Sequence, residues 1–291
     1  MPRRTLGRTG LLVPEVSFGC GPVSGLLTGT NVPLQLATVK RALDAGIDWF
    51  DTAAGYGNGT SESNLGRTLK ELGAAPRIAT KVRIPESGFD HIEDCVRESV
   101  RGSLARLGVG SLALLQLHNG ITRNRGEEPA SLTPADAIAV FEAFQKLRAD
   151  GVVRYFGLTG TGQPDALREV IRTGFFDTLQ VPFNRLNPSA GGGDAPTGET
   201  NYGNVIADAA AQGMGTFAIR VFAGGALLGR PPSEHTLKTP YFPLALYERD
   251  LQRASELGQS ADAAIRFVLD HPHVASAIIG FGSPDQVPAA P

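Results

Sequence analysis

Residues 46–57 read GIDWFDTAAGYG, and this stretch contains the pattern that decides the fold. An apolar run over residues 47–51 is followed by a loop rich in Gly, Ala and Thr, and residues 62–72 then place apolar side chains at helical spacing. A short buried strand, a loop and a covering helix form the repeating unit of parallel α/β proteins.

The same unit recurs along the chain. Further strands are expected at residues 15–19, 77–82, 112–118, 152–158, 178–183, 216–221 and 275–280. Helical patterns are expected at residues 34–45, 91–107, 134–150, 164–173, 204–212, 244–257 and 261–269. Eight parallel strands covered by helices are enough to close a barrel that side chains can fill. An open doubly wound sheet is also compatible with the periodicity.

We therefore expect residues 1–291 to form a single α/β domain, a (β/α)8 barrel of the TIM type. Residues 1–14 are expected to form an N-terminal β-hairpin outside the repeat. The connections at residues 119–133 and 187–201 are long and follow strands, which would place them on the catalytic face, as functional loops or idle insertions. Pro288, close to residue 291, predicts a short C-terminus.

Composition excludes several classes of partner. The 27 basic and 29 acidic residues leave a net charge of -2 with no block of either sign, which argues against nucleic acid and anionic membranes as partners. Neither an N-terminal signal nor an apolar run of about 18–20 residues is present, so a cytoplasmic location is expected. Cys20 and Cys95 are far apart in sequence, which favours free thiols and no metal site.

Four polar side chains stand where expected strands end. Asp51 closes one strand and Tyr56 lies in the following loop, while Lys81 and His118 end or nearly end the next two strands. In a barrel these ends converge on one rim. Each residue alone is explained more simply, as a helix cap, a half-buried aromatic, a surface lysine or a core histidine. Four together on adjacent strands indicate a catalytic site.

The chemistry of carbonyl reduction suits this set. Hydride transfer to a carbonyl leaves negative charge on its oxygen, so a proton donor is needed there. Tyr56 would be that donor, and a nearby Lys81 would lower its pKa toward working pH. Asp51 would keep the buried lysine charged, and His118 would orient the substrate oxygen. Because side chains offer no good hydride, a cofactor must supply it.

Two glycine-rich turns could approach a bound anion. Residues 19–25 read GCGPVSG, which departs from a dinucleotide fingerprint in spacing but brings backbone close at Gly21. Residues 157–162 read GLTGTG and also end a strand.

The stretch GIDWFDTAAGYG, followed by SESNLG at residues 61–66, resembles the signature of the aldo-keto reductases. The resemblance extends from LGRTG at residues 6–10 to GFGSPDQ at residues 280–286. It implies the eight-stranded barrel, a nicotinamide cofactor that is usually NADP, and a catalytic set formed by Asp51, Tyr56, Lys81 and His118.

The resemblance also implies a cofactor-binding set. Gln180 matches a glutamine that binds the nicotinamide carboxamide, and Thr159-Gly160 replaces the usual Ser-Asn. The loop that covers the pyrophosphate begins at Arg220, which could alternatively lie over the nicotinamide ring. The other positions of the set are Gly21, Phe222, Ala223, Gly225, Gly280, Ser283 and Gln286. Since Gly282 occupies the position of a basic residue for the 2′-phosphate, NAD remains an alternative to NADP.

The expected function is therefore NAD(P)H-dependent reduction of an aldehyde or ketone, or the reverse oxidation of a sugar or alcohol. Pro22 and Asn119 are expected to contact the small-molecule substrate. Two other functions stay open, namely a nicotinamide-binding regulatory or interaction barrel without catalysis and a lyase with Lys81 as Schiff-base nucleophile. The sequence leaves the oligomeric state undetermined.

Overall fold

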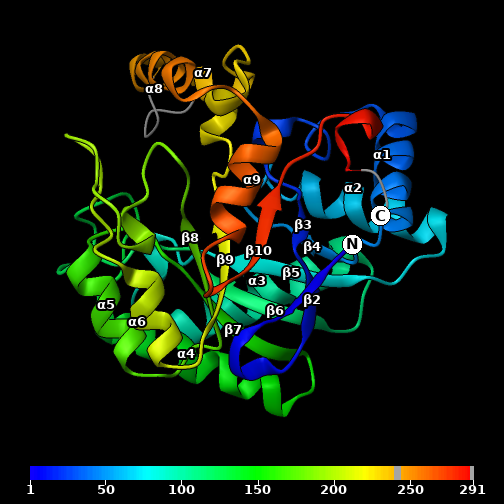
Figure 1. The fold of residues 1–291 in the computed structure, drawn as a ribbon. Coiled ribbons are helices and arrows are strands. Elements are labelled where there is room, and N and C mark those ends of the chain that lie inside the picture. The colour runs from blue at the N-terminus through cyan, green and yellow to red at the C-terminus, as the bar shows by residue number, and fades with distance from the viewer. Residues whose placement is uncertain (239–243, 289–291) are drawn as a thin grey trace.

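Eight parallel strands close into a barrel in the computed structural model, which describes residues 1–238 and 244–288 (Figure 1). The barrel strands are β3 (Val16–Gly19), β4 (Trp49–Asp51), β5 (Arg77–Val82), β6 (Leu112–Leu117), β7 (Val153–Thr159), β8 (Thr178–Pro182), β9 (Gly215–Ile219) and β10 (Val274–Ile279). Because β10 pairs with both β9 and β3, the sheet has no free edge. The expected barrel is confirmed, and the open sheet is excluded.

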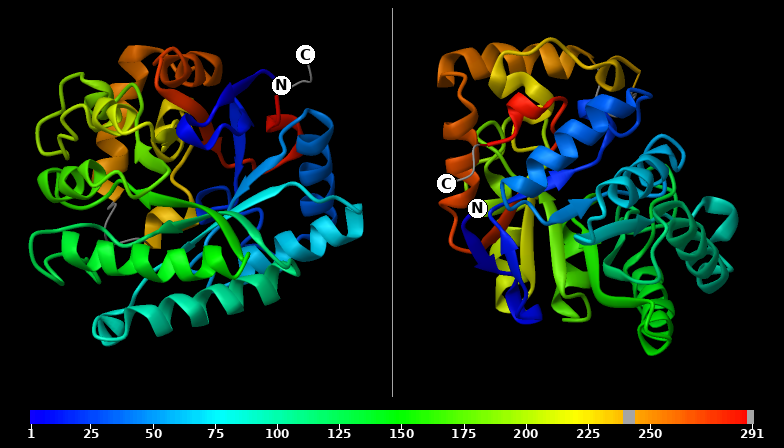
Figure 2. Two further views of the ribbon diagram at one scale, coloured as in Figure 1. Left: turned by 90° about the horizontal axis from the view of Figure 1, so that it is seen from below. Right: turned by 90° about the vertical axis from the view of Figure 1, so that its right-hand side faces the viewer.

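Helices cover the outside of the barrel (Figure 2). They are α1 (Val32–Asp44), α2 (Thr60–Leu72), α3 (Ile92–Leu107), α4 (Pro134–Ala149), α5 (Pro164–Arg172), α6 (Val205–Ala211) and α9 (Ala261–Leu269). The helices α7 (Glu234–Lys238) and α8 (Leu244–Leu257) lie above the barrel in Figure 1, where α8 packs against residues 223–228. The N-terminus of α4 is fixed by a capping box, in which Thr133 and Asp136 each accept the other's backbone N–H.

The N-terminal hairpin closes the lower end of the barrel in the view of Figure 1. Its strands β1 (Arg3–Thr5) and β2 (Leu12–Pro14) pair antiparallel, as expected. Leu6 is fully buried and shares an apolar cluster with Trp49 and Phe217. Gly7 lies so close to β9 that an added Cβ would sit 2.3 Å from the Gly215 nitrogen. Only glycine fits there, so the hairpin seals this end tightly.

The barrel interior changes from apolar to polar along the strands. Trp49, Ala79 and Leu114 belong to the lower apolar cluster. Two residues further along β4, β5 and β6, the side chains are Asp51, Lys81 and Gln116. Since alternate residues of a strand face the same side, these polar groups lie above the apolar layer, at the end toward which the strands run. We call this end the carboxyl-terminal rim.

The long connections leave from the same rim. Residues 119–133 link β6 to α4, and residues 187–201 lie between β8 and α6. Ile121 forms isolated bridges with Leu132 and Gly162, so the first connection is tied down at both ends. Part of the expected short C-terminus, residues 289–291, lies outside the described residues. In the described part of the chain, no helix is both long and apolar enough to cross a membrane.

Candidate active site

Lys81 and Asp51 form a buried ion pair at the carboxyl-terminal rim. The Lys81 Nζ lies 2.5 Å from Asp51 Oδ1 and donates a second hydrogen bond to the Thr52 carbonyl at 2.9 Å. Both side chains are almost completely buried. Burial is the largest single influence on the Lys81 pKa and lowers it, but the charges and hydrogen bonds of Asp51 and Tyr56 together outweigh burial and raise the pKa to about 12. Lys81 is therefore protonated at neutral pH.

Tyr56 meets this pair from the loop after β4. Its hydroxyl accepts a hydrogen bond from Lys81 Nζ at 3.2 Å, and its ring packs edge-on against His118 with centroids 5.8 Å apart. The loop is held by Ser61, whose backbone N–H donates to the Tyr56 carbonyl and whose hydroxyl donates to the Cys20 carbonyl. These contacts fix the phenol beside the ammonium.

From the sequence, Lys81 was expected to lower the pKa of Tyr56, and the structure corrects part of that expectation. Lys81 does favour the phenolate, as expected, but burial acts in the opposite direction and is the larger effect. The Asp51 charge adds to it, so the pKa of Tyr56 is raised above its ordinary value of 10.0. Burial depends on surrounding chain segments that a motif does not reveal.

His118 follows β6 and faces the same group. Burial is the main cause that lowers its pKa to about 3, and the positive charges of Lys81 and Arg83 act in the same direction. The imidazole is therefore neutral at working pH and can donate one hydrogen bond.

Two glutamines complete the site, and one of them was not identified from the sequence. Gln180 Nε2 and Gln116 Nε2 each donate to Asp51 Oδ2 at 2.9 Å. Gln116 was missed although it stands two residues before His118 in an apolar strand. An isolated polar residue on the same strand face as a catalytic candidate was the signal that could have found it.

A second buried carboxylate anchors the helix that follows the Tyr56 loop. Glu62 of α2 is fully buried, accepts a hydrogen bond from the Thr80 hydroxyl at 2.5 Å and pairs with Arg106 of α3 at 2.7 Å. Because α2 begins four residues after Tyr56, the two contacts of Glu62 tie the Tyr56 loop to both β5 and α3.

The residues expected to hold the carboxamide of a cofactor lie next to each other. Thr159 and Gln180 are register partners on β7 and β8, and the Gly160 N–H donates to the Gln180 carbonyl at 2.7 Å. The Thr159 hydroxyl is buried and has no hydrogen-bond partner among the described residues. A carboxamide both donates and accepts, so a free hydroxyl beside a glutamine fits it.

The expected pyrophosphate loop has an unusual backbone. Arg220 and Ala223 have φ angles of 54° and 48°, and Gly225 has a φ of 116°. Positive φ angles at residues other than glycine are costly, and they concentrate at binding sites. The loop includes the 3-10 helix Ala223–Leu228, and Phe222, at its N-terminal boundary, is partly buried.

The last expected cofactor segment lies against the first turn of the chain after β3. A Cβ on Gly280 would lie 3.2 Å from the Ser24 Cβ, while Gln286 accepts the Gly282 N–H at 2.9 Å. The Ser283 hydroxyl is the main cause that lowers the pKa of Asp285, and the charge of Arg230 contributes. Arg230 was not expected from the sequence.

Of the turn after β3, Gly21 approaches the site directly, since a Cβ there would lie 3.7 Å from the Tyr56 ring. Pro22 follows in the 3-10 helix Pro22–Ser24 and is partly exposed. The expected substrate contact of Asn119 stays a prediction. Its buried amide accepts the Ile84 N–H and donates to the carbonyls of Ile84 and Ala130, so both of its N–H groups join two loops together.

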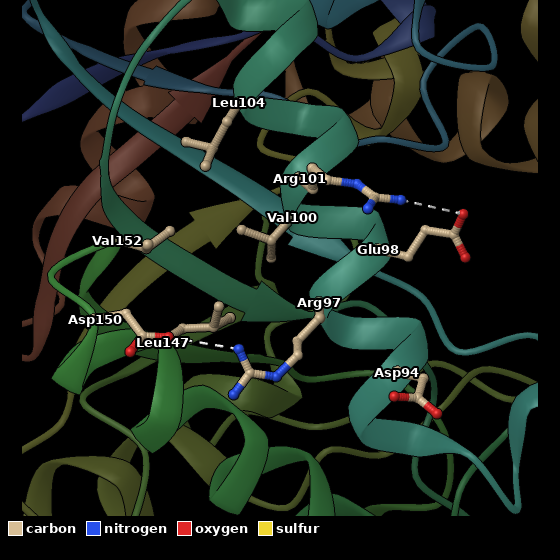
Figure 3. A pocket seen from close by; sticks show the side chains of 9 residues that line it. All are labelled: Asp94, Arg97, Glu98, Val100, Arg101, Leu104, Leu147, Asp150 and Val152. Atoms are coloured by element: carbon tan, nitrogen blue, oxygen red, sulfur yellow. Dashed lines mark hydrogen bonds and ion pairs between the residues drawn. The ribbon is translucent and has the colours of Figure 1, made fainter.

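Two hollows on the outside of the barrel lie away from the rim. One, of about 610 Å³, runs between α3 and α4, and Figure 3 shows two ion pairs among the side chains that line it. Arg97 contacts Asp150, and Arg101 contacts Glu98. Both arginines of this hollow are thus already paired with carboxylates. Among the described residues, no three His, Cys, Asp or Glu side chains are grouped so as to hold a metal ion.

The fold and the site define a (β/α)8-barrel protein with a carboxylate, an ammonium, a phenol and an imidazole gathered at the carboxyl-terminal rim. The chain belongs to the Aldo/keto reductase family, whose model matches residues 15–290. It is therefore an NAD(P)-dependent oxidoreductase.

Curated relatives include sugar dehydrogenases. The chain is 30% identical to D-threo-aldose 1-dehydrogenase of Pseudomonas sp over 314 residues, which cover 96% of this chain and 88% of the relative. It is 27% identical to L-galactose dehydrogenase of Arabidopsis thaliana, with 98% and 85% covered.

Solved structures agree over nearly the whole chain. The aldo-keto reductase AKR11C1 from Bacillus halodurans, in its holo form, gives a TM-score of 0.73 at 26% identity and covers 99% of this chain and 88% of that chain. The glycerol dehydrogenase AKR11B4 from Gluconobacter oxydans gives a TM-score of 0.67 at 23% identity, with 95% and 85% covered, which supports the fold alone.

Proposed function

We propose that this enzyme interconverts a carbonyl compound and its alcohol, with Tyr56 as the general acid in reduction and the general base in oxidation. The observation that carries the proposal is the position of Lys81, whose ammonium contacts Asp51 on one side and the Tyr56 hydroxyl on the other. The bound nicotinamide would supply or accept the hydride.

Each side chain has a defined part in this proposal. Lys81 stabilises the phenolate that Tyr56 becomes after it gives up its proton. Asp51 keeps Lys81 charged in a buried position. Neutral His118 donates a hydrogen bond to the substrate oxygen and orients it toward Tyr56. Because the imidazole stays neutral, it does not add a second positive charge that would compete with Lys81.

We propose NADP(H) as the preferred cofactor, with NAD(H) as the weaker alternative. Thr159, Gly160 and Gln180 would hold the nicotinamide carboxamide. The loop from Arg220 to Gly225 would cover the pyrophosphate, and Gly280, Ser283 and Gln286 would face the adenosine. Position 282 provides no cation for a 2′-phosphate, but Arg230, next to Gly225 and close enough to influence Asp285, provides one from another segment.

The substrate is proposed to be a small carbonyl compound or a sugar. Two relatives are named as dehydrogenases of an aldose or of galactose, which favours a sugar that is oxidised at the anomeric carbon. Pro22 would contact it, because Pro22 directly follows Gly21, whose position faces the Tyr56 ring. We also propose a cytoplasmic location, with Cys20 and Cys95 as free thiols.

The two rival functions are weaker. A Schiff-base nucleophile needs a lowered pKa, whereas Asp51 raises that of Lys81 to about 12. A purely regulatory barrel would bind the cofactor without turnover. Titration of the protein with NADPH and NADH, followed by assays with a panel of aldehydes and aldoses, tests the proposal. Binding without turnover on any of these substrates would reject it.

A further inference from the structure

The two oxygens of the Asp51 carboxylate have separate partners. Oδ1 faces Lys81 at 2.5 Å, whereas Oδ2 accepts one amide N–H from Gln116 and one from Gln180, both at 2.9 Å. Hydrogen bonds to a buried carboxylate are short and directional, so they fix its rotation as well as its charge. The ion pair is thus oriented by two amides for which no hydrogen bond to Tyr56 is found among the described residues.

The structure makes room for Gln116 in a specific way. Gln116 is completely buried and is the register partner of Lys81 on one side and of Gly157 on the other. A Cβ on Gly157 would lie 2.7 Å from the Gln116 Cγ, so the missing side chain there provides its space. Among the described residues, Gln116 Oε1 has no hydrogen-bond partner. The amide therefore has one evident use, which is to hold Asp51.

We propose that Gln116 is a positioning residue of this site, which holds Asp51 by Oδ2 so that Oδ1 stays directed at Lys81. This inference rests on the proposed role of Tyr56. Gln180 makes the same contact, but it is also the proposed ligand of the nicotinamide carboxamide. Gln116 is then the amide donor to Asp51 that has no proposed contact with the cofactor.

The titratable groups that face Tyr56 show what this orientation controls. They are Asp51 on β4, Lys81 on β5 and His118 after β6, with the Cys20 thiol after β3. His118 is neutral, so Lys81 supplies the positive charge. Burial opposes that charge, and Asp51 sustains it. If Asp51 is less firmly held, Lys81 stabilises the Tyr56 phenolate less well.

The test is a direct titration of Tyr56 in Gln116→Met and Gln116→Asn. Methionine keeps the size and removes the donors, and asparagine keeps the amide but is one methylene too short. Tyrosinate absorbance is recorded against pH in the protein without cofactor, and the Tyr56→Phe curve is subtracted to isolate Tyr56. We expect the Tyr56 midpoint to rise by about one pKa unit in both variants. In the same variants, kcat should fall by about tenfold while the Kd for NADPH stays the same.

Thr178→Val is the matched control. The Thr178 hydroxyl points into the same space, since it lies 2.5 Å from the position of a Cβ on Gly157, and it has no hydrogen-bond partner among the described residues. Its loss should leave the Tyr56 midpoint unchanged. An unchanged midpoint in both folded Gln116 variants, or an equal shift in Thr178→Val, overturns the proposal. Full turnover in Tyr56→Phe would reject the proposed function instead, because the titration does not depend on catalysis.

Discussion

The Lys81 ammonium lies 3.2 Å from the Tyr56 hydroxyl and 4.9 Å from the centre of the same ring. The lysine therefore interacts with the acidic group and with the aromatic system that carries the charge of the phenolate. The hydroxyl contact and the ring contact of Tyr56 can be tested separately, because a phenylalanine keeps the ring and removes the hydroxyl.

Tyr56→Phe should lose turnover by about 10²–10⁴-fold, since the proton donor is gone. The ring contact with His118 is preserved, so the cofactor should bind as in the wild type. Steady-state assays and a fluorescence titration with NADPH measure the two effects separately. Turnover close to that of the wild type would remove Tyr56 from the mechanism.

Lys81 should make stability depend on alkaline pH. Its pKa in the folded protein, about 12, exceeds the ordinary value of 10.5, so the folded state holds the proton more tightly than the unfolded chain. This contribution is complete below pH 10.5 and is lost as the pH rises through about 12. Urea unfolding over this range should show a steeper loss for the wild type than for Lys81→Met. Parallel curves would show that Lys81 is not held by Asp51.

His118 should make the stability of the protein depend on acidic pH. Its pKa in the folded protein is about 3, below the ordinary 6.5, so the unfolded chain takes up the proton first. The protein should therefore lose stability as the pH falls from 6.5 toward 3, and His118→Gln should lose less. Urea unfolding of both proteins at about pH 4 and about pH 7 gives the comparison. An identical loss in the two proteins would mean that the imidazole is readily protonated.

Arg230→Gln should weaken NADPH binding more than NADH binding, because only NADPH carries the 2′-phosphate. Removal of one charge-assisted contact corresponds to about a tenfold loss of affinity. Arg154→Gln is a suitable control, since Arg154 lines the other surface hollow, beside Arg77 and Val153 at the start of their strands. Equal losses for the two dinucleotides would place Arg230 away from the 2′-phosphate.

Arg106→Met should destabilise the fold, because it leaves the fully buried Glu62 carboxylate without its cation. Breaking a buried pair costs about 3–5 kcal/mol, and the partial exposure of Arg106 favours the lower end of that range. Adding Glu62→Gln should recover most of the loss, as measured by urea unfolding. If the double variant is as unstable as the single one, the pair is not the cause.

The sequence predicts the barrel closely because strands and helices differ in period. The strand at residues 77–82 is found as β5 with the same bounds, and the hairpin lies where GRTG indicates a turn. The strand expected at residue 47 begins at Trp49, because the Ile47 N–H is bonded to the Ala42 carbonyl at the end of α1. Such local competition is not visible in an apolar run.

The catalytic candidates are also predictable, since the ends of parallel strands meet at one rim. The contact of Gln116 with Asp51 is not predictable, because it depends on the register of β5, β6 and β7 and on the space left by Gly157. Asn119 follows His118 and was expected to face the substrate, yet its amide satisfies loop backbone. Register and loop packing are long-range properties that a single motif does not contain.

The N-terminal hairpin leaves the barrel open at one end only. Leu6 and Gly7 close the end opposite Tyr56, where the apolar side chains around Trp49 and Phe217 fill the barrel interior. If Tyr56 is the proton donor, its exchange of protons with bulk water would then take place through the carboxyl-terminal rim. A cofactor bound across the carboxyl-terminal rim would isolate the reacting proton from the solvent for as long as the cofactor stays bound.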